Sequence, residues 1–151
     1  MAWTEIEQML EKPYWIVDIL PKQVPAGSPG QYFAAESYWL EEPRITEIRR
    51  KHLEVLIRLN CYYDLLVSAD GGTNRIKNPA PEELEERILR GRGGNVCVLA
   101  ESGHALMVFR PDDTYFTVYD PDDGFLEMLR VLAAAEGLFV WRPDRHDGCS
   151  L

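Results

Sequence analysis

The chain is poor in cysteine and in basic residues, and each shortage argues against a class of protein. Its three cysteines, Cys61, Cys97 and Cys149, form no Cys-x-x-Cys pair, so the sequence indicates neither a disulfide framework nor a zinc knuckle. Only 16 lysines and arginines oppose 25 aspartates and glutamates, which gives a formal charge of −9. Because nucleic-acid-binding proteins usually present a basic face, we expect no nucleic-acid partner.

Long apolar runs are also missing from the sequence. No run approaches the roughly 20 residues that a membrane-spanning helix needs, and the acidic first seven residues lack the basic and apolar parts of a signal peptide. We therefore expect no membrane partner and a cytoplasmic location. The 46% apolar and 27% charged residues are ordinary for a globular domain.

Motifs that identify a chemistry are scarce as well. The glycine-rich residues 71–73 and 91–94 lack the spacing of a phosphate-binding loop. The acidic turn at residues 120–124 does not match a calcium loop, because Gly124 falls where a ligand belongs, and aspartate is the usual residue of turns and helix caps. We expect no metal site and no cofactor, and the sequence identifies no catalytic residue.

The second half of the chain carries the clearest structural pattern. Ser102-Gly103 is a two-residue loop of the kind that closes a hairpin, and Pro111 begins the turn into the next strand. Strands that follow one another through such short turns pair antiparallel. The predicted strands are residues 96–101, 104–110, 114–120 and 138–142, and the predicted helix is residues 125–136.

Upstream of this meander, periodicity and turn residues predict four helices and two more strands. Apolar residues recur at helical spacing in residues 44–60, whereas residues 14–20 are rich in the aromatic and branched residues that strands favour. Residues 70–81 show the least structure. The predicted helices are residues 5–11, 30–40, 44–60 and 82–90, and the predicted strands are residues 14–20 and 61–68.

These elements predict an α+β fold in a single domain, residues 1–142, with residues 143–151 as a flexible tail. We expect an antiparallel β-meander sheet of about four to six strands, with helices packed on one face. The predicted register pairs Leu99 with Leu106 and Val108 with Thr117. One face of the meander is then wholly apolar and requires a cover of helices, while the opposite face is mixed and is the face on which we expect a site.

Two functional hypotheses follow from the residues. The leading one is a non-enzymatic binding protein, of the adaptor, immunity or regulatory kind, that presents an acidic and aromatic surface to a basic protein partner. Its expected interface residues are Tyr32, Tyr38 and Trp39, because so many aromatic residues on one short helix are hard to bury together.

The alternative is a small enzyme or ligand-binding protein that uses the mixed face of the sheet. Its pocket groups would be Glu101, His104, Tyr115 and Tyr119. A third interpretation, a structural subunit, predicts a homodimer, and the sequence does not rank it against the first.

Several runs of the chain resemble an uncharacterised family of small acidic bacterial proteins. They are residues 15–25 (WIVDILPKQVP), 30–36 (GQYFAAE), 112–115 (DDTY) and 138–143 (LFVWRP). The resemblance implies a bacterial cytoplasmic setting, and it assigns no activity and no catalytic residue.

Overall fold

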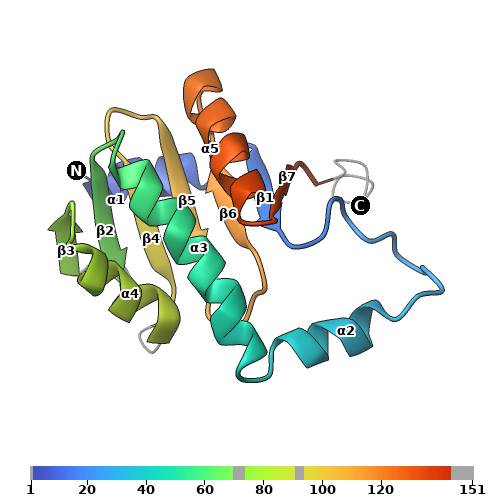
Figure 1. Cartoon of the computed structure of the whole chain (residues 1–151). Helices are drawn as coiled ribbons and strands as arrows, with labels where there is room; N and C mark the ends of the chain where they lie inside the picture. Colours follow the sequence, from blue (N-terminus) through green and yellow to red (C-terminus); the bar gives the residue numbers. More distant parts are fainter. Residues whose placement is uncertain (1, 70–73, 91–93, 144–151) are drawn as a thin grey trace.

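A computed structural model describes residues 2–69, 74–90 and 94–143 of the chain. In this part of the chain it shows a single α+β domain with five helices and a seven-stranded antiparallel sheet (Figure 1). The predicted fold class is confirmed, and the sheet is larger than predicted. The tail predicted at residues 143–151 lies outside the described residues except for Pro143. The helices are α1 (Ala2–Met9), α2 (Tyr32–Trp39), α3 (Arg44–Asn60), α4 (Pro81–Arg90) and α5 (Asp123–Ala135).

The sheet has the strand order β3-β2-β4-β5-β6-β1-β7, so the meander β4-β5-β6 forms its centre. The predicted register is confirmed, since Leu99 pairs with Leu106 and Val108 pairs with Thr117. Ser102 and Gly103 both have positive φ, as a tight hairpin loop requires. The strands are β1 (Tyr14–Asp18), β2 (Leu65–Ala69), β3 (Asn74–Lys77), β4 (Val96–Ala100), β5 (Ala105–Phe109), β6 (Phe116–Tyr119) and β7 (Phe139–Trp141).

Helices α3, α4 and α5 cover the face of the sheet that was predicted to be apolar. Figure 1 shows α3 and α5 crossing in front of the central strands. The predicted stripe of α3 is buried, with Leu56 and Leu59 fully enclosed. From α5, Phe125 and Leu129 join the same core. Burial of this much apolar surface is the main stabilising contribution to the fold.

The opposite face of the sheet is divided between two covers. Ile6 and Met9 of α1 pack on Leu99, Leu106 and the ring of Tyr119 in a second, smaller core. The sequence predicted helices on one face only, because the mixed composition of this face marked it as the face of a site. The half of this face formed by β6, β1 and β7 is partly enclosed by the segment that follows β1.

Helix α2 stands apart from both cores. Figure 1 shows it projecting from the body of the domain, at the end of the long segment that follows β1. No residue of α2 is buried. The side chains exposed on its outer face are those of Phe33, Ala34, Ser37 and Tyr38, and we call this set the α2 outer face.

Strand β3 was missed by the sequence analysis, which left residues 70–81 without regular structure. Its four residues pair with β2 at the edge of the sheet, for example Ile76 with Val67. Ile76 is the only apolar residue of the strand, so no alternating pattern marked it.

Candidate functional site

The four residues predicted to form a pocket on the mixed face do not lie together. Glu101 forms a salt bridge with Lys77 of β3, with Nζ and Oε1 3.3 Å apart. His104 lies at the other end of the same turn, beside the start of α5, where its Nδ1 is 2.5 Å from Oδ2 of Asp122.

The two tyrosines of that predicted set both lie near Tyr14 of β1. Tyr119 is buried in the smaller core, and its ring centroid is 5.3 Å from that of Tyr14. Tyr14 and Tyr115 both line a cavity of about 310 Å³, which we call the β1 cavity. The structure thus places Tyr115 at a hollow on the predicted face and places the other three residues outside it.

The β1 cavity lies against β1 and β7, under the segment that follows β1. Its volume is at the lower end of the range of small-molecule sites, roughly 300 to 1,000 Å³. Among the described residues that line it, six have charged or aromatic side chains: Tyr14, Asp18, Lys22, Tyr32, Tyr115 and Trp141.

Strand alternation explains how β1 supplies its share of the lining. Ile16 pairs with Thr117 and with Trp141, so it lies on the mixed face, whereas Val17 lies in the main core. Tyr14 and Asp18 are two residues away from Ile16 on either side, and they share its face. Trp141 is held in place because its indole Nε1 donates a hydrogen bond to the carbonyl of Leu20, 3.0 Å away.

Asp18 is the most unusual group of the β1 cavity. Its side chain is only 6% exposed, and burial raises its pKa to about 6. The backbone N–H groups of Ile19 and Leu20 oppose that shift in pKa, and the negative charge of Glu36 adds to it. Oδ1 of Asp18 accepts the Ile19 hydrogen bond at 2.7 Å. A carboxyl group with a perturbed pKa in a hollow of the surface is a common feature of binding sites.

The pKa values of the tyrosines around Asp18 also indicate negative charge nearby. Burial raises the pKa of Tyr32 to about 12, helped by the charge of Glu36, to which the Tyr32 hydroxyl donates a hydrogen bond of 3.3 Å. The pKa of Tyr115 is raised by burial and by the charge of Asp113. Both phenols are therefore neutral hydrogen-bonding groups at physiological pH.

Sequence reasoning did not select Asp18 or Trp141 as site residues. Asp18 is the single charge in the strand predicted at residues 14–20, and no sequence pattern predicts that the chain folds back over it. The only signal available was that charge itself, because a carboxylate in a predicted strand is rarely buried without a role.

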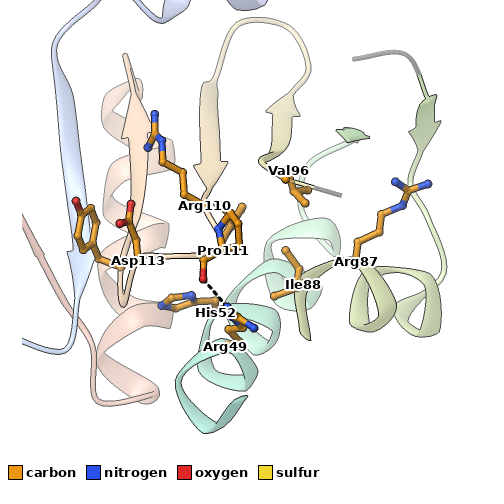
Figure 2. Close-up of a pocket in the computed structure, with 11 residues that line it drawn as sticks. Arg49, His52, Arg87, Ile88, Val96, Arg110, Pro111 and Asp113 are labelled. Atoms are coloured by element: carbon orange, nitrogen blue, oxygen red, sulfur yellow. Dashed lines mark hydrogen bonds between the residues drawn. The ribbon is translucent and has the colours of Figure 1, made fainter. Parts of the chain in front are cut away.

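A second cavity, drawn in Figure 2, lies between α3, α4 and the turn after β5. It contains Arg49, Arg87 and Arg110, which suggests an anion site. Figure 2 shows, however, that the side chains of Arg87 and Arg110 extend in different directions, while Arg49 donates a hydrogen bond to the carbonyl of Pro111. Its volume of about 20 Å³ holds about one water molecule. We assign it no ligand.

His52 of α3 borders this small cavity. It is 3% exposed, and its Nε2 atom has no hydrogen-bond partner among the described residues. Burial, with a smaller effect of Arg49, lowers its pKa to about 3, so the imidazole is neutral. Its ring packs edge-on to Phe116 at 5.0 Å, which makes it a residue of the core.

The described part of the chain shows no arrangement of side chains suited to metal binding or to thiol chemistry. No group of three or more His, Cys, Asp or Glu side chains there is placed to hold a metal ion. Cys61 is exposed at the end of α3, and Cys97 is half-buried with a pKa raised by that burial. Within the same residues no helix is long and apolar enough to cross a membrane.

The three residues predicted to form a protein interface divide between two sides of α2. Tyr38 lies on the α2 outer face and is 56% exposed, and the guanidinium of Arg44 lies 3.7 Å from its ring centroid. Tyr32 and Trp39 lie on the inner side and are half-buried. Sequence reasoning omitted Phe33, which is 79% exposed. Helical spacing could have placed Phe33 on the same face as Tyr38, since residues 33 and 37, and 34 and 38, lie one turn apart.

No family model, no curated protein and no solved structure matches this chain. The resemblance to small acidic bacterial proteins therefore stays a prediction.

Proposed function

We propose that this protein is a non-enzymatic binding protein, of the adaptor, immunity or regulatory kind, which binds a basic protein partner through the α2 outer face. The observation that carries this proposal is that α2 buries no residue of its own and leaves Phe33 and Tyr38 exposed. An isolated helix of this length is unstable in water. Arg44 of α3 holds the end of α2, because its guanidinium donates a hydrogen bond to the carbonyl of Tyr38 and lies over the Tyr38 ring.

Exposed aromatic residues favour protein recognition over other uses of this surface. Phenylalanine and tyrosine combine large contact area with few rotatable bonds, and such residues dominate the energetics of protein interfaces. The small residues Ala34 and Ser37 lie between Phe33 and Tyr38 on the same face, so a partner can approach the helix backbone closely.

Charge supports a basic partner. Residues 23–43 contain three glutamates, Glu36, Glu41 and Glu42, and no lysine, arginine or histidine. Together with the net charge of −9, this segment attracts a positively charged surface and accelerates encounter with it.

The experiment is affinity capture from bacterial lysate with three forms of the protein: wild type, Phe33→Ala and Tyr62→Ala. Tyr62 is a matched control, because it is 66% exposed but lies beyond the end of α3. We expect a basic protein that wild type and Tyr62→Ala retain and that Phe33→Ala loses. Both replaced side chains are on the surface, so stability should change by only about 0.5 kcal/mol or less.

The contribution of charge is measured separately, from the association and dissociation rates of the purified protein and its captured partner. Raising the salt concentration from about 0.05 M to about 0.5 M should slow association at least about tenfold and leave dissociation nearly unchanged. Identical capture by all three forms, or an association rate constant that does not depend on salt, contradicts the proposal.

A second candidate function, ligand binding, is supported by the β1 cavity and its buried carboxyl group.

A further inference from the structure

The β1 cavity combines a buried carboxyl group with a wall of aromatic rings. We infer that it binds a single organic cation, an ammonium or guanidinium group, between Asp18 and the rings of Tyr14, Tyr32, Tyr115 and Trp141. This inference goes beyond the proposed protein-binding function and does not depend on it.

The first argument is that Asp18 lacks a charge partner. No salt bridge among the described residues includes it, although it is only 6% exposed. A buried carboxylate is unfavourable unless a cation or several hydrogen bonds compensate it. Its nearest charged neighbour in electrostatic effect is Glu36, another carboxylate. A positively charged ligand compensates the charge of Asp18 and offsets the repulsion between Asp18 and Glu36.

The second argument is the chemistry of the walls. The faces of tyrosine and tryptophan rings carry negative potential and attract cations within about 6 Å, the arrangement that proteins use to recognise alkylated ammonium groups. Trp141 has its N–H group occupied by Leu20, so its ring is fixed against the cavity. The Tyr32 hydroxyl donates its hydrogen to Glu36, which leaves its oxygen lone pairs available to accept from a ligand N–H.

Other ligand classes fit these walls less well. An anion would meet Asp18 and Glu36, and an apolar ligand would leave the carboxyl group of Asp18 desolvated and uncompensated. Lys22 is the one cationic side chain among the described lining residues, and it is exposed. It forms none of the salt bridges of the described part of the chain.

The cation has two sources with the same chemistry. It can belong to a free amine, or it can be the side chain of a lysine or arginine on a protein partner. The volume of about 310 Å³ is sufficient for the head and stem of either.

The test is a titration of the ¹⁵N-labelled full chain, followed by NMR, with N-acetyl-arginine amide and N-acetyl-lysine amide. N-acetyl-citrulline amide is the neutral control, since it has nearly the shape of the arginine ligand without its charge. We expect saturable shifts of β1 and β7 amides and of the Trp141 indole N–H with at least one cation and none with citrulline. Absence of binding by both cations, or equal binding of citrulline, overturns the inference.

Three variants test where the ligand binds. Asp18→Asn removes the charge and should weaken cation binding at least about tenfold, because a charge-assisted hydrogen bond is lost. Asp123→Asn makes the same change of charge at an exposed position of α5 and should leave binding unchanged. Unchanged binding in Asp18→Asn overturns the inference, as does loss of binding in a Lys22→Gln variant that retains its fold.

The source of the cation follows from a comparison with the blocked peptide Gly-Gly-Arg-Gly-Gly. Binding of the peptide at least about tenfold tighter than N-acetyl-arginine amide supports a protein side chain, whereas equal affinities support a free amine. Either result upholds the cation site. Identical protein capture by wild type and Phe33→Ala with normal cation binding means that the proposed function alone fails. Capture that depends on Phe33, without cation binding, means that this inference alone fails.

Discussion

His104 and Asp122 are joined by two hydrogen bonds. The backbone N–H of Asp122 donates to the carbonyl of His104 at 2.9 Å, and Nδ1 of His104 is 2.5 Å from Oδ2 of Asp122. The other carboxylate oxygen of Asp122 accepts from the N–H of Phe125 at 2.8 Å and so caps α5. A residue predicted to line a pocket therefore fixes the β4–β5 turn to the first turn of a helix.

Replacement of Asp122 should show this role. Asp122→Ala removes the cap and the contact with His104, and we expect it to lower the free energy of unfolding by about 1 to 2 kcal/mol. His104→Ala should lower it by only about 0.5 to 1 kcal/mol, because the cap remains. Urea denaturation at pH 7 measures both. A larger loss for His104→Ala than for Asp122→Ala contradicts this assignment.

The pKa of Asp122 gives a pH dependence to the same pair. Its hydrogen bonds to Phe125 and His104 hold the pKa below the usual 3.8. The stabilisation is therefore complete above pH 3.8 and is lost as the pH falls through the lower value of the folded state. The difference in stability between wild type and Asp122→Ala should accordingly shrink as the pH falls below 3.8.

Asp18 should behave in the opposite way. Because its pKa rises from 3.8 to about 6 on folding, the folded state binds the proton more tightly, and stability is lost as the pH rises from 3.8 to 6. Asp18→Asn removes this loss and should raise the free energy of unfolding by about 3 kcal/mol at pH 7.5 and about 1 kcal/mol at pH 4.5.

Urea denaturation at the two pH values measures this effect, with Asp123→Asn as the control. The titratable groups that act on Asp18 or line the same cavity are Glu36, Tyr14, Tyr32, Tyr115 and Lys22, and all five are unchanged in the variant. A variant that is less stable than wild type at pH 7.5 shows that the ionised carboxylate stabilises the fold and contradicts the prediction.

His52 supplies a third pH effect. Its pKa falls from 6.5 to about 3 on folding, so its stabilising contribution is complete above pH 6.5 and is lost as the pH decreases. We expect a loss of about 2 kcal/mol at pH 5 relative to pH 7.5. Asp18 opposes this loss in the wild type, so the clean measurement compares Asp18→Asn with Asp18→Asn/His52→Leu. Equal slopes of stability against pH in these two proteins contradict the prediction.

Asn78 holds the edge strand β3 to α3 and β2. Its Oδ1 accepts from the N–H of Leu65 and from the side chain of Asn60, both at 2.9 Å, and its φ is +48°. We expect Asn78→Ala to lower the free energy of unfolding by about 2 to 4 kcal/mol, since it loses the hydrogen bonds and strains the backbone. Asn78→Gly should lose about 1 to 2 kcal/mol less, because glycine adopts positive φ freely. Thermal or urea denaturation of both variants checks the difference.

Local signals were sufficient for most of the elements of this fold. The helix predicted at residues 44–60 has those bounds in α3, and the register of the meander was correct because turn residues and alternating faces specify it together. Short polar β3 carried no such pattern. The packing of α1 on the mixed face could not be predicted from local patterns either. It depends on contacts between distant parts of the chain, such as Ile6 with Leu106.

The candidate site was less predictable than the fold. Periodicity placed Tyr115 on the correct face, and it also placed His104 there. It could not show that the turn would direct His104 to Asp122, or that the segment after β1 would fold back over Asp18. Positions that depend on how a loop returns to the sheet are not encoded in spacing along one strand.

The place of β1 in the sheet has a consequence for how the chain folds. It is the first strand in sequence, yet its partners are β6 and β7, with Tyr14 opposite Tyr119 and Asp18 opposite Phe139. Closing that loop is the most distant pairing in the molecule and slows folding by its entropy. During synthesis, β1 emerges from the ribosome long before its partners, and the floor of the β1 cavity forms only when β6 and β7 arrive.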